Sequence, residues 1–169
     1  STVLIDSGGN VDCKPFHLVQ FAMMGDAYAK YILGKEEPRI GVLSNGEEEG
    51  KGNELTREVH HILSETDLNY IGYVEGRDLN SGSVDVIVCD GFVGNVALKT
   101  SEGLAQMLAS SLREEFKRNW LTKLAALIAI SVLNNFKRRF DHRRYNGAIL
   151  LGLKGISVKS HGSADVLAF

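Results

Sequence analysis

The chain has 169 residues, of which 44% are hydrophobic, and this is enough to bury a sizeable core in one domain. A formal net charge of −2 gives no general attraction to nucleic acid, so we expect no nucleic-acid partner. Only two cysteines occur, Cys13 and Cys89, which is typical of reduced thiols in a cytoplasmic protein.

Short apolar strands alternate with amphipathic helices along the first two thirds of the chain. The expected strands are residues 3–5, 39–43, 69–74 and 84–89. The expected helices are residues 15–34, 54–63 (after Asn53 as N-cap) and 94–118. This alternation favours an α/β fold with a mainly parallel sheet covered by helices. Near the end, residues 148–153 and 155–159 are expected to pair as strands.

Glycines and one lysine fill the loop that follows the second strand. In the phosphate loop of nucleotide-binding proteins, four residues separate the glycines and a Ser or Thr follows the lysine. Here three residues separate Gly46 from Gly50, and Gly52 follows Lys51, so we exclude that motif. Lys51 is then either a solvated side chain or a cation that neutralises a phosphate or a developing oxyanion.

Charged residues also follow the third strand. Glu75, Arg77 and Asp78 surround Gly76 at the point where that strand should end. Such a group fits a ligand site and an ion-paired turn about equally well.

The most informative segment is residues 84–100. A strand rich in Val and Ile, as expected of a strand buried on both faces, leads into an acidic turn at Asp90 and then a helix. Ligands of open α/β sheets bind at the carboxyl ends of such strands, and the N–H groups that begin a helix suit an anion. We therefore expect a site for phosphate or carboxylate here.

Four further residues of this segment contribute to that expectation. Gly91 and Gly94 remove side-chain bulk where the backbone turns and where a ligand would approach. Asn95 and Lys99 are four residues apart and so share one face of the following helix.

Residues 117–145 interrupt the alternation and should form a helical protrusion from a single α/β domain spanning residues 1–169. An apolar stretch between Leu121 and Leu133 has basic residues on both sides. It is shorter than the about 20 residues needed to span a membrane, but it suits a position in the headgroup layer of an anionic membrane. A dimer interface explains it equally well. The membrane or partner surface would comprise Trp120, Leu124, Leu127, Ile128, Lys137, Arg138 and Arg139.

Of the five histidines, only His161, in a polar turn after a strand, is a candidate binding residue. Neither a Cys/His metal-ligand pattern nor a Gly-x-Ser-x-Gly nucleophile turn is present, so we expect no metal and no cofactor.

Several segments together resemble one family closely, the PlsX-type phosphate acyltransferases of bacterial phospholipid synthesis. The resembling segments are residues 6–15, 20–25, 46–54, 72–78, 88–100 and 145–165. The runs Cys-Asp-Gly-Phe-Val-Gly-Asn and Val-Glu-Gly-Arg-Asp are the most specific of these. The resemblance extends over essentially the whole chain, but it corresponds to the carboxyl-terminal half of a family member.

The resemblance implies an isocitrate-dehydrogenase-like, three-layer α/β/α sandwich that works as a homodimer. It implies an enzyme that moves a fatty acyl group from acyl carrier protein to inorganic phosphate. The acyl phosphate product would pass to a membrane-bound glycerol-3-phosphate acyltransferase, which fits a cytoplasmic protein held peripherally at an anionic membrane.

The residues suggest a division of labour for this reaction. Lys51 and Asn95 would polarise the thioester carbonyl. The residues expected to bind substrate are Asp90, Gly91, Gly94, Lys99, Glu75, Arg77 and His161. The basic side chains expected to steer the acidic carrier protein are Lys117, Arg118, Arg138 and Arg139.

Alternatives of two classes stay open. One is a related enzyme, such as a phosphate acetyltransferase that uses acyl-coenzyme A or a nicotinamide-dependent dehydrogenase. The other is a non-catalytic, membrane-associated module that binds acyl carrier protein.

Overall fold

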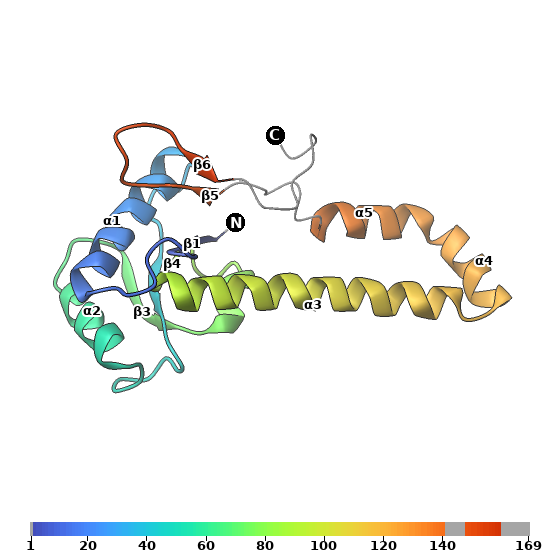
Figure 1. Cartoon of the computed structure of the whole chain (residues 1–169), viewed down its shortest axis with the longest axis horizontal. Helices are drawn as coiled ribbons and strands as arrows, with labels where there is room; N and C mark the ends of the chain where they lie inside the picture. Colours follow the sequence, from blue (N-terminus) through green and yellow to red (C-terminus); the bar gives the residue numbers. More distant parts are fainter. Residues whose placement is uncertain (1, 141–147, 160–169) are drawn as a thin grey trace. The chain divides into compact units, whose positions relative to one another are not determined.

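The computed structural model describes residues 2–140 and 148–159 (Figure 1). The chain divides into two compact units, residues 1–99 and 100–169, and each is described by itself. That both belong to one domain with a protrusion at residues 117–145 stays a prediction.

A parallel four-stranded sheet forms the centre of the first unit. Its strands are β1 (Val3–Ile5), β2 (Ile40–Leu43), β3 (Tyr70–Val74) and β4 (Val86–Val88), in the order β1-β4-β2-β3. All three pairings are parallel, so the carboxyl ends of the strands meet at one edge of the sheet. Every residue of β2 and β4 is buried, which explains why both sequences are continuously apolar.

Two helices cover one face of this sheet. Helix α1 (Pro15–Tyr31) contacts β1 and β4, and helix α2 (Glu54–Ser64) contacts β2, β3 and α1. Small residues allow α1 to lie close to the sheet, because a Cβ atom at Gly25 would come within 2.5 Å of a methyl group of Val86. Asn53 caps α2 as expected, and its side chain accepts a hydrogen bond from the Thr56 amide.

The other face of the sheet carries a smaller apolar cluster. Its buried members are Leu43, Val74, Val84, Ile87 and Cys89, and Leu4 and Leu79 pack against them. Leu79 belongs to a short 3₁₀-helix, η1 (Gly76–Asn80), which directly follows β3. The structure therefore confirms an α/β fold with a parallel sheet, while the three-layer sandwich and the isocitrate-dehydrogenase-like fold stay predictions.

Helix α3 (Gly91–Lys117) begins in the first unit, three residues earlier than the sequence predicts. Gly91 and Gly94 therefore belong to the first helical turn rather than to a turn before it. The reason is the preceding residue: the Asp90 carboxylate accepts a hydrogen bond from the Val93 amide at 2.8 Å, which caps the helix at once.

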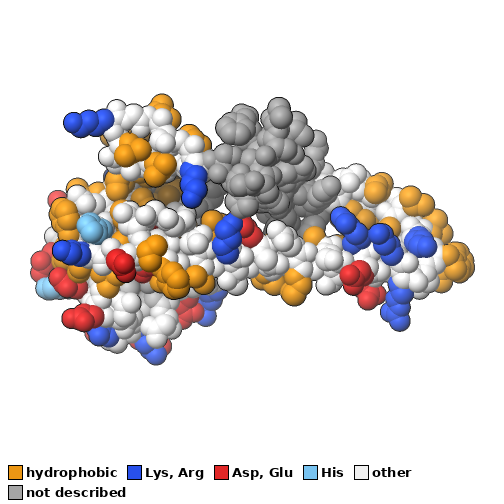
Figure 2. Space-filling model, in the orientation of Figure 1, with side chains coloured by type: hydrophobic (Ala, Val, Ile, Leu, Met, Phe, Trp, Pro, Cys, Tyr) orange, Lys and Arg blue, Asp and Glu red, His pale blue; other side chains and the backbone are white. Residues whose placement is uncertain are grey.

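The second unit contains the rest of α3, followed by α4 (Trp120–Ile128), α5 (Ile130–Phe140) and a short antiparallel pair, β5 (Ala148–Ile149) and β6 (Val158–Lys159). No residue of α4 is buried, and Trp120 and Ile128 are 72% and 78% exposed. Hydrophobic side chains are visible on this part of the surface in Figure 2. No helix within residues 2–140 and 148–159 is long and apolar enough to cross a membrane.

Candidate functional site

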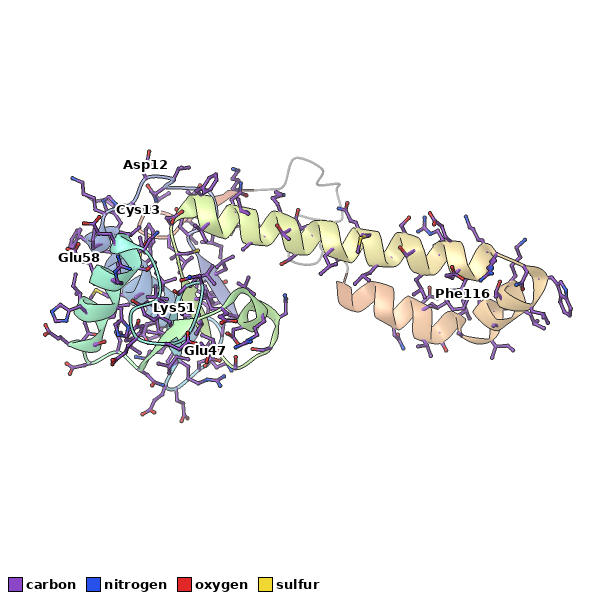
Figure 3. All side chains as sticks on the ribbon, turned by 90° about the horizontal axis from the view of Figure 1, so that it is seen from below. Asp12, Cys13, Glu47, Lys51, Glu58 and Phe116 are labelled. Carbon is purple, nitrogen blue, oxygen red and sulfur yellow. The ribbon has the colours of Figure 1, made fainter. Side chains whose placement is uncertain are left out.

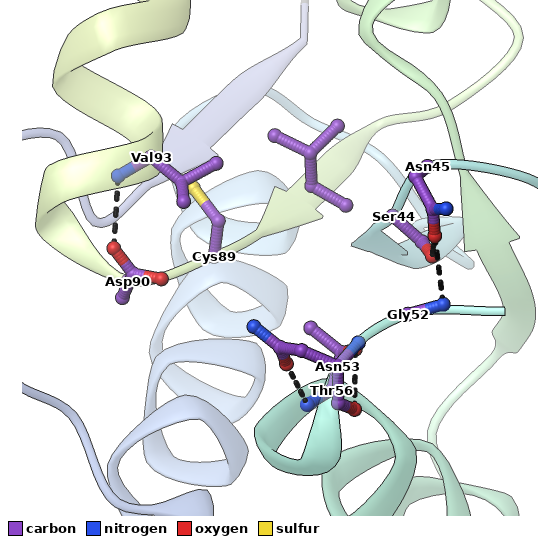
Figure 4. Close-up of a pocket in the computed structure, with 9 residues that line it drawn as sticks. Ser44, Asn45, Gly52, Asn53, Thr56, Cys89, Asp90 and Val93 are labelled. Atoms are coloured by element: carbon purple, nitrogen blue, oxygen red, sulfur yellow. Dashed lines mark hydrogen bonds between the residues drawn. The ribbon is translucent and has the colours of Figure 1, made fainter.

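A cavity of about 450 Å³ lies at the carboxyl edge of the sheet, where β2 and β4 end (Figure 4). The nine residues that line it are Leu43, Ser44, Asn45, Gly52, Asn53, Thr56, Cys89, Asp90 and Val93. All belong to the first unit. They come from the ends of two neighbouring strands and from the first turns of α2 and α3, which is where ligands of open α/β sheets bind.

The loop between β2 and α2 forms one wall of the cavity. The side-chain oxygen Oδ1 of Asn45 accepts a hydrogen bond from the Gly52 amide at 2.8 Å, which draws the two ends of the loop together (Figure 4). The guanidinium of Arg57 donates to the Gly52 carbonyl at 2.8 Å. Gly52 has a φ of +81°, and a Cβ atom there would clash with the Thr56 hydroxyl, so only glycine fits here.

The start of α3 forms the opposite wall. The Asp90 side chain and main-chain carbonyl accept hydrogen bonds from the amides of Val93 and Gly94, and the Gly91 amide donates to the Asn10 carbonyl at 2.8 Å. Three of the helix-terminal amides expected to hold an anion are thus satisfied within the chain. A phosphate at this helix would have to approach beside the Asp90 carboxylate.

Both glycines of this turn pack against the loop that follows β1. A Cβ atom at Gly91 would come within 2.8 Å of the Asn10 carbonyl oxygen, and one at Gly94 would clash with the Asp6 carbonyl oxygen. The Asp6 carboxylate in turn folds the loop by accepting hydrogen bonds from the amides of Gly9 and Asn10. Gly91 and Gly94 therefore have a packing role in the structure, and a role in ligand binding stays a prediction.

Asn95, one of the two expected catalytic residues, lies on the exposed side of the first turns of α3. Its side chain lies beside Gly8 in the loop after β1, where an added Cβ atom would come within 3.7 Å of Asn95 Cγ. It does not line the cavity, and neither does Lys99.

Lys51, the other expected catalytic residue, is exposed and directly precedes the cavity-lining Gly52. Figure 3 labels it on the same loop as Glu47. Its side chain lies over Gly46, where a Cβ atom would come within 2.9 Å of Lys51 Cγ and 2.7 Å of the Glu48 carboxylate. The Lys51 amide donates to the Glu48 carbonyl at 3.2 Å, which closes a turn at the tip of the loop.

The charged residues after β3 form ion pairs. Arg77 Nη2 lies 2.9 Å from Glu47 Oε1, and Arg77 Nη1 lies 3.3 Å from Glu75 Oε2. Asp78 caps η1 by accepting a hydrogen bond from the Glu75 amide at 2.9 Å. Of the two interpretations that the sequence allowed, this geometry matches the ion-paired turn.

The two thiols are poorly suited to nucleophilic chemistry. Burial, followed by the charges of Asp90 and Asp6, raises the pKa of the Cys89 thiol to about 12. Burial also raises the pKa of Cys13. Both side chains are therefore neutral thiols near pH 7. Within the described residues, no group of three or more His, Cys, Asp or Glu side chains is placed to hold a metal ion.

Sequence reasoning missed the contribution of Ser44, Asn45 and Thr56 to the cavity. The signal was present, because the first two are the residues that immediately follow a fully buried strand. His161 lies outside the described residues, as do the side chains of Lys137, Arg138 and Arg139. Trp120, Leu124, Leu127 and Ile128 are all exposed.

A parallel sheet with a cavity at its carboxyl edge places the chain among the α/β proteins, a class in which ligands bind at that edge and which contains many enzymes. Residues 1–169 match the family described as "Fatty acid synthesis protein", and the chain belongs to this family.

Proteins named phosphate acyltransferase are close relatives. The chain is 59% identical over 168 residues to that of Paraburkholderia phymatum, which covers 99% of this chain and 45% of the relative. It is 58% identical over 167 residues to that of Syntrophotalea carbinolica, and the match covers 99% of this chain and 48% of the relative. It is 55% identical over 164 residues to that of Citrifermentans bemidjiense, and the match covers 97% of this chain and 47% of the relative. The chain thus spans about half the length of the curated relatives it matches.

Proposed function

We propose that this chain takes part in transferring a fatty acyl group from acyl carrier protein to inorganic phosphate, which gives an acyl phosphate for phospholipid synthesis. The observation that carries the proposal is the 59% identity, over 99% of the chain, to a protein named phosphate acyltransferase. The cavity at the carboxyl edge of the sheet supports it, because ligands of open α/β sheets bind at that edge.

The chemistry requires placement and charge relief more than activation. A phosphate oxygen is already an anionic nucleophile, and it attacks the thioester carbonyl carbon to form a C–O bond. The C–S bond then breaks, and the thiolate of the carrier's prosthetic arm leaves with the electron pair. The active-site residues must therefore hold phosphate near the thioester. They must also stabilise the oxyanion that forms after attack and before the C–S bond breaks.

In this proposal Lys51 supplies a positive charge and Asn95 a neutral hydrogen-bond donor to the developing oxyanion. Lys99, one helical turn beyond Asn95, contributes charge to phosphate binding. The part of Asp90 is to fix the first turn of α3, since its carboxylate already accepts a hydrogen bond from Val93 and would repel phosphate.

We propose further that the second unit serves partners rather than chemistry. An exposed apolar surface on α4, comprising Trp120, Leu124, Leu127 and Ile128, is suited to the headgroup layer of an anionic membrane or to a second copy of the chain in a homodimer. The neighbouring Lys117 and Arg118 provide positive charge for the acidic carrier protein. A membrane position would deliver acyl phosphate to the downstream glycerol-3-phosphate acyltransferase.

The test is phosphate-dependent release of free carrier protein from acyl carrier protein by the full-length protein. We expect release to saturate with phosphate and acyl phosphate to appear in equal amount. Release that does not depend on phosphate would contradict the proposal. Turnover of acyl-coenzyme A in place of the carrier-bound acyl group would favour the acetyltransferase-like alternative, and binding of the carrier without turnover would favour a non-catalytic module.

A further inference from the structure

An ion pair joins η1 to the middle of the β2–α2 loop. Arg77 Nη2 and Glu47 Oε1 are 2.9 Å apart although the two residues are 30 positions apart in the sequence. Glu47 lies in the same loop as Lys51, four residues before it. The contact therefore connects the end of β3 to the segment that carries the expected catalytic lysine.

The rest of that loop is held mainly at its ends. Asn45 and Arg57 bind Gly52 at the base, and the tip is closed on itself by the hydrogen bond from the Lys51 amide to the Glu48 carbonyl. Within the described residues, Arg77–Glu47 is the side-chain ion pair that connects residues 46–50 to another element of the fold. Gly50 and Gly52 have φ values of +91° and +81°, so the loop also lacks side chains that would stiffen it at these points.

Arg77 itself is anchored to the sheet edge. Its second guanidinium nitrogen lies 3.3 Å from the carboxylate of Glu75, which directly follows β3. The Glu75 amide donates to Asp78, and the Asp78 carboxylate also accepts from Ser83 at 3.2 Å. The Arg77 side chain thus connects a turn that is fixed by hydrogen bonds to a glycine-rich loop.

We propose that Arg77 is a positioning residue that acts through Glu47 to hold the β2–α2 loop, and with it Lys51, at the edge of the cavity. The inference rests on the proposed function, because that function gives Lys51 its role. It assigns Arg77 no contact with substrate, unlike the sequence-based expectation. The pair also neutralises one of three successive carboxylates, Glu47 to Glu49, in this loop.

The experiment is a charge swap in the full-length protein. Arg77→Glu and Glu47→Arg are made singly and together. Glu49→Arg is the control, because it changes the charge of the β2–α2 loop by the same amount as Glu47→Arg. Two quantities are measured for each variant: kcat for phosphate-dependent release of carrier protein, and hydrogen exchange of the peptide that contains residues 46–52.

Each single swap should lower kcat about fivefold, the size of effect that an exposed ion pair supports, with little change in KM for acyl carrier protein. Exchange in the loop should become faster in the same variants. The double swap should restore both quantities to within about twofold of the parent, since it rebuilds the pair with the charges reversed. Glu49→Arg should leave loop exchange unchanged.

Loss of kcat with unchanged loop exchange, and no rescue in the double swap, would overturn the proposal and indicate direct substrate contact by Arg77. Single swaps that change neither quantity would overturn it as well. If the parent protein itself releases no carrier protein with phosphate, the proposed function fails. That outcome is distinguished from failure of the positioning role of Arg77, because it appears before any substitution is made.

Discussion

The main-chain carbonyl oxygen of Asp6 occupies the space where a side chain at Gly94 would begin. Helix α3 can therefore lie against the loop after β1 only because residue 94 is glycine. The contact joins the carboxyl ends of β1 and β4, since Cys89 Sγ would also lie 2.9 Å from a Cβ atom at this position. Close packing of the helix onto a strand end is therefore one role of this glycine.

Gly94→Ala should destabilise the first unit by about 1–3 kcal/mol, because the added methyl group forces α3 away from Asp6. The free energy of unfolding in urea measures the effect. Gly103→Ala on the same helix is the matched control: apart from the backbone of its own helix, its Cβ position is open, so the substitution should stabilise by about 0.5–1 kcal/mol through helix propensity. Equal effects of the two substitutions would contradict the packing role.

Gly46 bears on the position of Lys51 in a similar way. Gly46→Ala places a methyl group 2.9 Å from Lys51 Cγ, so the lysine side chain must move. We expect turnover of the full-length protein to fall at least tenfold while its midpoint of thermal unfolding stays nearly unchanged. Gly76→Ala, where the Cβ position is open, should leave turnover as it is. Unchanged turnover in Gly46→Ala would show that the present position of Lys51 is irrelevant to the reaction.

Lys51→Ala and Asn95→Ala test the proposed oxyanion donors directly. Each should lower kcat by about 10²–10³, the usual effect of removing one such donor. Lys30→Ala, which removes an exposed lysine paired with Asp26 on α1, serves as the control and should keep full activity. Steady-state rates of carrier-protein release supply the measurement. If either donor variant keeps the rate of the parent, that residue has no part in polarising the carbonyl.

Sequence patterns identified the four strands, the helices that alternate with them and the edge of the sheet where the cavity lies, because burial and periodicity are local properties. Asn53 was recognised as a helix cap for the same reason. The roles of Gly91 and Gly94 were not recognisable, since they depend on the Asp6–Asn10 loop about 85 residues earlier in the chain. The ion pair between Arg77 and Glu47 could not be predicted from the sequence either. Glu75 is near Arg77 in the sequence, but Glu47 comes close to Arg77 only through the parallel pairing of β2 and β3.

At the opposite edge of the sheet, Asp85 connects the starts of β2 and β4. This carboxylate is only 4% exposed and lies 2.9 Å from Arg39 Nε and 3.0 Å from Lys35 Nζ. Hydrogen bonding to Arg39 holds the pKa of Asp85 well below its usual range despite burial. Asp85→Asn should cost about 1–3 kcal/mol near pH 7, because both cations lose their partner.

The pH dependence of that cost has a defined sign. A carboxylate with a lowered pKa in the folded state stabilises the protein above its unfolded pKa of about 4, and this contribution is lost as pH falls towards the folded value. Urea unfolding at several pH values should therefore show the parent and Asp85→Asn converging below about pH 4. Asp67→Asn, at an exposed position, should differ from the parent by less than about 0.5 kcal/mol throughout. A constant difference across the pH range would exclude the ionised pair as its source.

The exposed apolar surface of α4 can be tested apart from catalysis. Leu127 and Ile128 are 69% and 78% exposed, and burial of two such side chains in lipid is worth several kcal/mol, so Leu127→Glu with Ile128→Glu should abolish flotation with anionic vesicles. Val11→Glu with Phe16→Glu, which adds the same two negative charges at side chains 55% and 64% exposed in the first unit, controls for net charge. Sedimentation of the same variants without vesicles tests the dimer interface separately. If α4 forms that interface, the double substitution should convert dimers into monomers. Flotation and sedimentation that both match the parent would leave neither a membrane nor a dimer role for α4.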